Sequence, residues 1–133
     1  MITGIGIDIV QVERMRRWLN FPGLMERYFH PDELNAALSR GSGADLFYSA
    51  RFAAKEAFGK ALGTGFKGIA LKDIVVANRQ NGQPEIHVLG SALSELEKNG
   101  ANKIHLSMTH ERENAVAMVV LEIIKDDLEG VKR

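Results

Sequence analysis

Four side chains in this sequence have the types and spacing needed to handle a phosphate together with a metal ion. Asp8 ends an apolar N-terminal stretch, and His110 follows Ser107-Met-Thr109. Glu56 and Lys60 stand four residues apart in the middle of the chain. Two carboxylates with open coordination positions suit Mg²⁺, which takes further ligands from substrate phosphates. With Lys60 as the positive charge beside those phosphates, the residues indicate a metal-dependent enzyme acting on a phosphate ester or anhydride.

The same residues have plain structural interpretations. Glu56 and Lys60, in that order, are typical of a helix ion pair worth roughly 0.3–0.5 kcal/mol. Gly63-Thr64-Gly65 is typical of a helix C-cap. Arg51 over Lys55 is less ordinary, because like charges four residues apart repel by a similar amount. Such a column is tolerated in solvent and is useful where it faces an anion, so the residues alone leave both interpretations open.

One long helix must position most of these side chains. The sequence predicts it from near Asp45 to Gly63, with an apolar stripe that faces the core. The residues of that stripe are Phe47, Ala50, Ala54, Ala57, Phe58 and Ala61. Gly59 lies inside the helix, where it costs about 1 kcal/mol relative to Ala. An interior glycine of this kind marks a place that something must approach closely.

Residues 2–10 predict a strand with one face bare of side chains. Gly4, Gly6 and Asp8 point to one side and isoleucines to the other. A glycine face can pack close to an alanine-rich helix, and that contact would bring Asp8 towards Glu56. The Gly-x-Gly does not indicate a dinucleotide site, because the third glycine is missing and both glycines lie within the strand.

Residues 11–20 predict a short helix that carries Arg14, Arg17 and Trp18 away from its apolar face. Exposed arginines are often only a solvated face, but an exposed Trp beside them also suits an interaction patch. Further helical pieces open at Pro22 and Pro31, where Pro takes the first helical position.

The second half of the chain predicts mostly strands. Asn81-Gly82 lies between two short apolar runs and indicates a hairpin. A short helix over 91–99 separates that hairpin from strands at 103–109 and 115–124. The last strand is apolar on both faces, which in so small a domain suggests a partner subunit. Together the elements predict an α+β domain, with a small antiparallel sheet packed on one long helix plus short helices.

Composition narrows the classes of function. The chain has 133 residues, which predicts one domain over 1–124 with a polar tail over 125–133. Lys plus Arg equals Asp plus Glu at 17 each, so no net field favours nucleic acid or a membrane surface. There is no Cys, which excludes disulfides and thiolate sites. With neither a signal peptide nor a membrane-length apolar run, a cytoplasmic protein is expected.

Three motifs together resemble a known family. They are Gly4-Ile-Gly-Ile-Asp8-Ile, the run from Arg51 to Gly65 (RFAAKEAFGKALGTG) and Leu106-Ser-Met-Thr-His110. They are similar to those of the holo-[acyl-carrier-protein] synthases, the short single-domain branch of the 4′-phosphopantetheinyl transferases. The resemblance covers essentially the whole chain in order, and the middle motif is its most specific part.

The resemblance implies transfer of 4′-phosphopantetheine from coenzyme A to a serine of apo acyl carrier protein in fatty acid biosynthesis, releasing adenosine 3′,5′-bisphosphate. It implies that Asp8 and Glu56 bind Mg²⁺ and that Lys60 lies beside the pyrophosphate. It places coenzyme A along a groove and the nucleotide near a histidine. The residues of this groove are Arg51, Lys55, Gly63, Thr64, Gly65 and His110.

The resemblance also implies that Arg14 meets the carrier protein, with Arg17 and Trp18 beside it, and that the enzyme is a homotrimer with active sites between subunits. The general base stays open between Glu56, acting through a metal-bound water, and His110. Two other functions stay open: a Mg²⁺-dependent phosphohydrolase of a nucleotide-like substrate, and a non-catalytic trimeric binding module.

Overall fold

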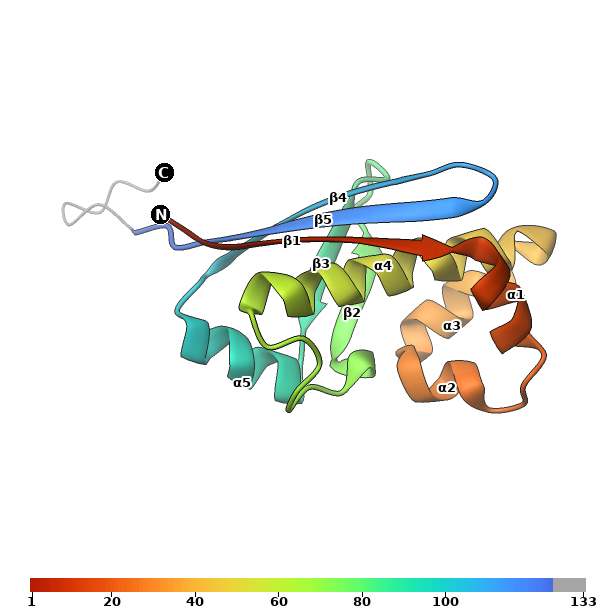
Figure 1. The fold of residues 1–133 in the computed structure, drawn as a ribbon, viewed down its shortest axis with the longest axis horizontal. Coiled ribbons are helices and arrows are strands. Elements are labelled where there is room, and N and C mark those ends of the chain that lie inside the picture. Colours follow the sequence, from red (N-terminus) through yellow and green to blue (C-terminus); the bar gives the residue numbers. More distant parts are fainter. Residues whose placement is uncertain (126–133) are drawn as a thin grey trace.

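The computed structural model describes residues 1–125 of the chain. Within them no helix is long and apolar enough to cross a membrane. The elements, in chain order (Figure 1), are β1 (Ile2–Gln11), α1 (Val12–Leu19), α2 (Leu24–Tyr28), α3 (Pro31–Leu38), α4 (Ala44–Leu62), β2 (Ile74–Asn78), β3 (Pro84–Val88), α5 (Gly90–Asn99), β4 (Lys103–His110) and β5 (Asn114–Glu122). Short 3₁₀ turns at Gly41–Gly43 and Leu71–Asp73 precede α4 and β2.

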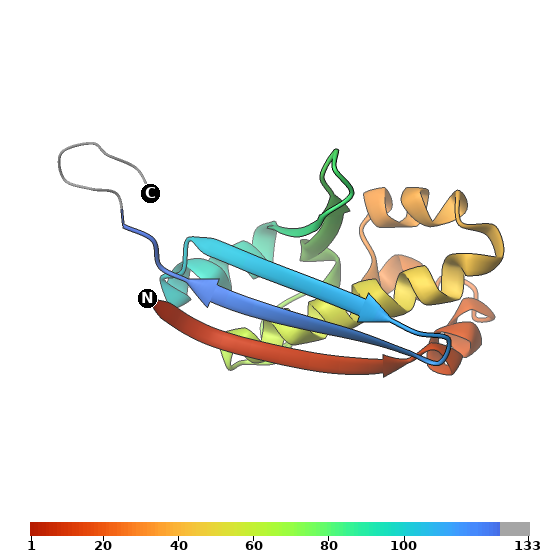
Figure 2. The ribbon, with the colours of Figure 1, turned by 90° about the horizontal axis from the view of Figure 1, so that it is seen from above.

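The architecture is a three-stranded antiparallel sheet laid across one long helix. The strand order is β1-β5-β4, and β2 and β3 form a separate hairpin. Figure 2 shows the three strands side by side above α4, with β5 in the middle. Helices α1 to α3 gather at one end of α4 and α5 lies towards the other (Figure 1). The predicted α+β class is confirmed, whereas the predicted polar tail lies outside the described residues from 126 onward.

The glycines of β1 let its backbone lie directly on α4. A Cβ atom at Gly4 would stand 1.9 Å from the carbonyl oxygen of Ala61, and one at Gly6 would stand 2.0 Å from that of Ala57. Real Cβ atoms do not approach so closely, so no larger residue fits without moving the strand. The contact between a glycine face and an alanine-rich helix forms as predicted, and it fixes where Asp8 meets α4.

Helix α4 is buried over more of its surface than the predicted stripe. Besides the alanines and phenylalanines, Ser49, Arg51 and Lys55 are buried. The helix ends at Gly63, whose φ of 82° gives the left-handed C-cap. Gly65 N–H then donates to the carbonyl of Gly59 at 3.0 Å, and a Cβ at Gly59 would stand 2.6 Å from Gly65 O. What approaches the interior glycine is therefore the chain itself.

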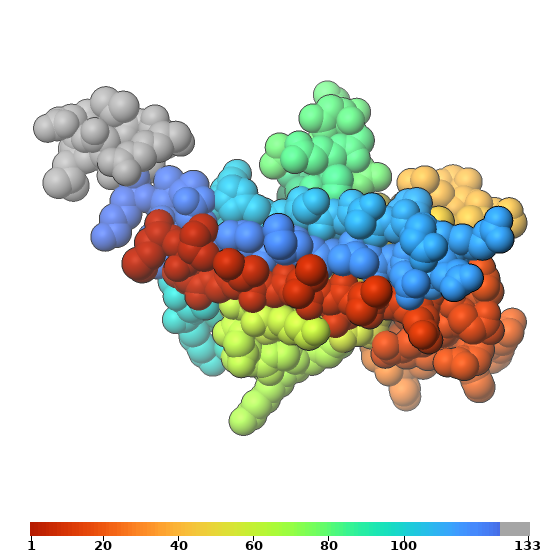
Figure 3. All heavy atoms as spheres, turned by 45° about the horizontal axis from the view of Figure 1, so that its top comes forward, coloured from red at the N-terminus to blue at the C-terminus, as the bar shows by residue number. Residues whose placement is uncertain are grey.

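The outer face of the sheet is apolar over β1 and the middle of β5, and residues 1–125 do not cover it. The inward residues of β5 are fully buried against α4: Ala115, Ala117, Val119 and Leu121. On the opposite face Ile5, Ile7 and Ile9 are 64%, 58% and 61% exposed, and Met118 is 42% exposed. Figure 3 shows the three strands as a continuous band across this side of the molecule. Strand β5 ends at Glu122 rather than 124, but it has two apolar faces as predicted.

Candidate active site

The carboxylate cluster, made of Asp8, Glu56, Lys60 and Arg14, lies where β1 crosses α4. Lys60 Nζ donates to Asp8 Oδ1 at 2.7 Å and to the carbonyl of Ile7 at 3.1 Å. Arg14 Nη1 approaches Glu56 Oε1 at 3.9 Å from α1. Lys60 thus pairs across the strand–helix contact with Asp8, and the two carboxylates predicted to meet do so.

The electrostatics of this cluster show how close the two carboxylates are. The pKa of Glu56 is raised above its usual 4.5, first by burial and then by the neighbouring Asp8 carboxylate, while Arg14 and Lys60 oppose the shift. The hydrogen bond to Asp8 raises the pKa of Lys60. Two carboxylates this close repel, and a cation between them relieves that repulsion.

The donor set of this cluster suits Mg²⁺. In residues 1–125 there is no group of three His, Cys, Asp or Glu side chains able to hold a metal ion by themselves. A pair of carboxylates fits an ion that keeps waters and shares phosphate oxygens with a substrate, and fits poorly an ion that needs a full protein cage. Asp8 and Glu56 are the residues that would hold it.

A second site, the arginine pocket, is a cavity of about 520 Å³ between α4, the β2–β3 hairpin and the end of β4. Its polar and aromatic lining is Arg40, Phe47, Arg51, Asn78 and His110. The guanidinium carbons of Arg51 and Arg40 stand 3.9 Å and 4.9 Å from the centre of the Phe47 ring. The two guanidinium groups thus lie close to the same Phe47 ring, and no carboxylate lines the pocket. Such a pocket suits an anionic ligand with a planar group.

Arg51 has a hydrogen-bond donor to spare in this pocket. Its Nη2 donates to Asn78 Oδ1 at 3.3 Å, while its buried Nε donates to no acceptor in the described part of the chain. Burial lowers the pKa of Arg51 to about 10, so the group is still positive at neutral pH. A buried charged donor without a partner is costly unless a ligand meets it.

The carboxylate cluster and the arginine pocket lie at opposite edges of the sheet. Asp8 on β1 pairs with Ala117 of β5, and Ala117 pairs in turn with Met108 of β4, which lines the arginine pocket. The structure therefore brings Asp8, Glu56 and Lys60 together but leaves His110 with the other group. The single constellation that the sequence suggested is divided into two half-sites within one chain.

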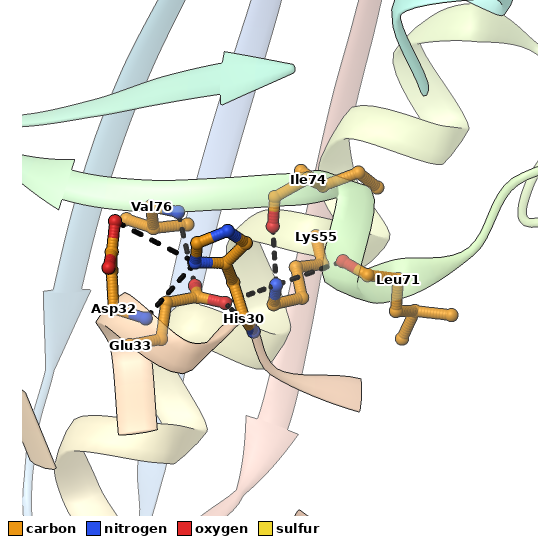
Figure 4. A network of polar contacts seen from close by, with 7 residues as sticks. All are labelled: His30, Asp32, Glu33, Lys55, Leu71, Ile74 and Val76. Carbon is orange, nitrogen blue, oxygen red and sulfur yellow. Dashed lines mark hydrogen bonds and ion pairs between the residues drawn. The ribbon is translucent and has the colours of Figure 1, made fainter. Parts of the chain in front are cut away.

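Lys55 is not on a solvated column with Arg51. Its side chain is completely buried, and Nζ donates to Glu33 Oε1 at 2.7 Å, to Leu71 O at 3.0 Å and to Ile74 O. Figure 4 shows these bonds converging on the ammonium group. Burial lowers the pKa of Lys55 and Glu33 opposes that shift. The anion that Lys55 faces is the chain's own carboxylate, so its expected contact with coenzyme A is not available in this arrangement.

The turn Gly63-Thr64-Gly65 follows directly on Lys60. It is exposed, and among residues 1–125 Thr64 Oγ1 donates only to the carbonyl of Gly65, at 3.3 Å. The bond between Gly65 and Gly59 folds this turn back along α4. The turn thus lies beside the carboxylate cluster, with its backbone open to a ligand.

On α1 the structure changes the role expected of Trp18. Its ring packs on Tyr28 and Phe52, with centroids 5.3 Å and 5.1 Å away, so the side chain is half-buried rather than free. The guanidinium carbon of Arg14 stands 4.9 Å from the Trp18 ring and 5.0 Å from that of Phe52. Of the three predicted partner residues, Arg17 is exposed, whereas Arg14 and Trp18 are partly buried.

Sequence reasoning missed Glu33, Arg40 and Asn78. Glu33 gave a signal only as one of the acidic residues after Pro31, which a helix N-terminus explains by itself. Arg40 and Asn78 are isolated polar residues next to a turn and at a strand end. Their importance comes from which face of α4 the hairpin covers, and periodicity does not contain that information.

Comparisons with known proteins agree on one family. The family model for the 4′-phosphopantetheinyl transferase superfamily matches residues 4–119. The holo-[acyl-carrier-protein] synthase of Treponema denticola is 53% identical over 122 residues, which cover 92% of this chain and 99% of that protein.

Solved structures agree as well. The Bacillus anthracis synthase in complex with CoA (3′,5′-ADP) is 40% identical with a TM-score of 0.79, covering 92% of this chain and 98% of that one. The Neisseria meningitidis synthase is 38% identical with a TM-score of 0.83, covering 92% and 99%. This chain belongs to the 4′-phosphopantetheinyl transferase superfamily, among its holo-[acyl-carrier-protein] synthases.

Proposed function

We propose that this enzyme transfers the 4′-phosphopantetheine arm of coenzyme A to a serine of an apo acyl carrier protein, in a Mg²⁺-dependent reaction. The observation that carries the proposal is the carboxylate cluster, in which Asp8 and Glu56 adjoin each other and Lys60, one turn after Glu56 on α4, donates to Asp8 at 2.7 Å. The likeness to a synthase solved with coenzyme A supports the choice of donor. Acyl carrier protein serves fatty acid biosynthesis, so we place the enzyme in that process and in the cytoplasm.

The reaction is a displacement at phosphorus. The serine oxygen forms a bond to the β-phosphorus of coenzyme A, the bond from that phosphorus to the bridging oxygen breaks, and adenosine 3′,5′-bisphosphate leaves. Such transfers depend mainly on positioning and on neutralising charge. Mg²⁺ held by Asp8 and Glu56 would supply charge neutralisation at the pyrophosphate. Lys60, whose side chain is half exposed beside Asp8, adds a positive charge for the leaving 5′-phosphate.

The serine proton needs a base, and Glu56 is the better candidate within one chain. It lies in the carboxylate cluster, where it would act through a water held by the metal ion. His110 lies with the arginine pocket, across β5 from the row that holds Asp8. His110 would reach the serine only where a neighbouring subunit brings it there.

We assign the arginine pocket to the nucleotide half of coenzyme A. Arg51 and Arg40 offer two positive charges, Arg51 Nε has no partner, and Phe47 and Pro84 offer apolar surface for a base. His110 completes the wall at the end of β4. The exposed turn 63–65 beside Lys60 would contact the rest of the coenzyme A molecule along α4.

The two half-sites make a shared active site between subunits the simplest assembly. One chain carries the carboxylate cluster at its β1 edge and the arginine pocket at its β4 edge. The uncovered outer face, with Ile5, Ile7 and Ile9 more than half exposed, supplies an apolar surface for subunit contact. We propose a homotrimer in which the carboxylate cluster of one subunit and the arginine pocket of the next bind a single coenzyme A.

The carrier protein is expected to dock on α1, which lies next to the carboxylate cluster. Arg14 links the two, because it approaches Glu56 from α1. Arg17 is exposed on the same helix and suits an acidic partner. Such charges mainly set the association rate and its salt dependence.

The test is to incubate the protein with coenzyme A, Mg²⁺ and apo carrier protein and to follow the products by mass spectrometry. We expect the carrier to gain the mass of one phosphopantetheine arm, and adenosine 3′,5′-bisphosphate to appear. Release of a free small molecule with an unmodified carrier would instead identify a phosphohydrolase. No change in either would leave a binding module and would overturn the proposal.

A further inference from the structure

The ion pair between Lys55 and Glu33 is completely buried and has no part in the chemistry proposed above. Both side chains are 0% exposed, and the two charged atoms lie 2.7 Å apart. Lys55 comes from α4 and Glu33 from α3, so the pair joins two helices that follow one another in the chain.

Three hydrogen bonds of this pair are directed at a third element, β2 with the turn before it. Lys55 Nζ donates to the carbonyls of Leu71 and Ile74, as Figure 4 shows. Glu33 Oε2 accepts from the backbone N–H of Val76 at 3.1 Å. The pair therefore binds one β2 carbonyl and one β2 N–H, which fixes both the height and the register of that strand on α4.

The other end of Glu33 is also held. Its Oε1 accepts from the backbone N–H of His30 at 2.9 Å, which closes a capping box at the start of α3. Glu33 can therefore not follow β2 if the strand shifts. The pair is anchored to two helices and holds the strand between them.

Stability alone does not account for such a pair. Burying two charges costs much of what their attraction returns, and well-packed apolar residues of the same volume are often as stable. Apolar residues would not fix the position of the strand, because dispersion contacts are not directional and let one element slide along another. Hydrogen bonds to particular backbone atoms prevent such sliding. A buried pair with these bonds therefore indicates that the position of β2 on α4 has to be fixed.

The position that matters is that of the hairpin wall of the arginine pocket. β2 ends at Asn78, whose side chain accepts the hydrogen bond from Arg51, one helical turn before Lys55 on α4. Gly82 and Pro84 of the same hairpin line the pocket opposite Phe47. A hairpin displaced along α4 would lose the Arg51–Asn78 bond and change the width of the pocket.

We propose that Lys55 and Glu33 are positioning residues for the nucleotide half of coenzyme A: they hold the β2–β3 hairpin on α4 so that the arginine pocket has the width its ligand needs. The inference rests on the proposed function, because it takes that pocket as the nucleotide site. It assigns Lys55 an effect on coenzyme A affinity that acts through the hairpin without contact with the ligand.

The experiment measures binding of adenosine 3′,5′-bisphosphate by calorimetry to the full chain, which reads the nucleotide site without the transfer reaction. Lys55→Met keeps the aliphatic volume and removes the three bonds, and Glu33→Gln keeps the shape and removes the charge. The matched control is Val119→Ala, a fully buried position on β5 that faces α4 away from the hairpin. Light scattering on each variant ensures that assemblies of the same size are compared.

We expect Lys55→Met to weaken binding by about tenfold or more, since displacements near 1 Å have effects of this size. Glu33→Gln should weaken it less, because its amide oxygen can still accept from Val76. In turnover assays both should raise the KM for coenzyme A while kcat at saturation and the KM for the carrier stay near those of the wild type. Val119→Ala, though less stable, should bind as the wild type does.

Two results would overturn the inference, and they are distinct. If the wild type binds adenosine 3′,5′-bisphosphate and Lys55→Met binds it equally well, the pair is only structural and the proposed function stands. If the wild type does not bind adenosine 3′,5′-bisphosphate, the arginine pocket is not the nucleotide site, and this inference is wrong as well. Where Lys55→Met does not fold, unchanged binding by Glu33→Gln together with a lowered melting temperature would have the same meaning as the first result.

Discussion

Glu56 is the residue whose chemistry depends most on its surroundings. It is partly buried beside a second carboxylate, and both causes raise its pKa. Arg14 and Lys60 relieve the charge only in part, because Lys60 is bonded to Asp8. Binding of a proton or a metal ion to a carboxylate destabilised in this way stabilises the folded protein. The free energy of unfolding of the metal-free protein should therefore depend on the charge of Glu56.

The first prediction concerns Glu56→Gln. Since the pKa of Glu56 is higher in the folded than in the unfolded protein, protonation contributes stability that is fully present below pH 4.5 and is lost as the pH rises through the raised folded value. Without metal at neutral pH, Glu56→Gln should therefore melt at a higher temperature than the wild type. Mg²⁺ should raise the melting temperature of the wild type and leave that of the variant unchanged. A variant stabilised by Mg²⁺ as strongly as the wild type would remove Glu56 from the metal site.

The second prediction concerns Lys60→Ala. Lys60 stands beside Asp8 with its side chain half exposed, so it is available to a phosphate and is not needed by the core. Its charge should matter most as the leaving phosphate gains charge, and kcat should fall by about 100-fold with little change in the affinity for coenzyme A. Single-turnover kinetics and calorimetry separate these effects. A large loss of affinity with unchanged kcat would make Lys60 a binding residue only.

At the scale of elements, the contact between β1 and α4 could be predicted from the sequence. The packing of α3 and β2 against α4 could not. Gly4 and Gly6 alternate with isoleucines, and that pattern by itself requires a neighbour without room for side chains. The Arg51–Lys55 spacing does not show what the two side chains meet, because the partners of Lys55 lie in other elements, Glu33 on α3 and Ile74 on β2, whose packing on α4 periodicity does not predict. Trp18 was misplaced for the same reason, since Tyr28 and Phe52 pack against it from other helices.

The third prediction tests the β1–α4 contact. Gly6→Ala places a Cβ 2.0 Å from a helix carbonyl, and since backbone cannot yield as a side chain does, the strand must move. We expect a loss of about 3 kcal/mol in the free energy of unfolding, together with weaker Mg²⁺ binding because Asp8 moves with the strand. Gly43→Ala is the control, because its Cβ meets nothing within 4 Å, and it should cost less than about 1 kcal/mol. Equal denaturation midpoints for the two variants would show that the contact is looser than the structure has it.

For the whole molecule, the arrangement of the two half-sites is the central fact. The order β1-β5-β4 places β5 between them, and the apolar outer surface of β1 and β5 is uncovered in the part of the chain that the structure describes. An assembly of three chains around this face would cover it and bring unlike edges of neighbouring chains together, as closed rings of heterologous contacts do. The sequence indicated the uncovered strand but not the division of the site, because the motifs do not state on which edge each residue falls.

The last prediction follows from that division and uses two variants, each damaged in one of the two half-sites. Lys60→Ala damages the carboxylate cluster, and Arg51→Ala damages the arginine pocket. A site shared between two subunits is therefore intact where an Arg51→Ala chain supplies its carboxylate cluster and a neighbouring Lys60→Ala chain supplies its arginine pocket. With random mixing in co-expressed assemblies, about one site in four is restored, and activity should return to about a quarter of the wild-type value. Co-expression of Asp8→Ala with Lys60→Ala is the control, since both damage the same half-site and no arrangement restores it. If the first pair stays as inactive as the second while native mass spectrometry shows mixed trimers, each subunit acts alone and His110 has no part in its neighbour's reaction.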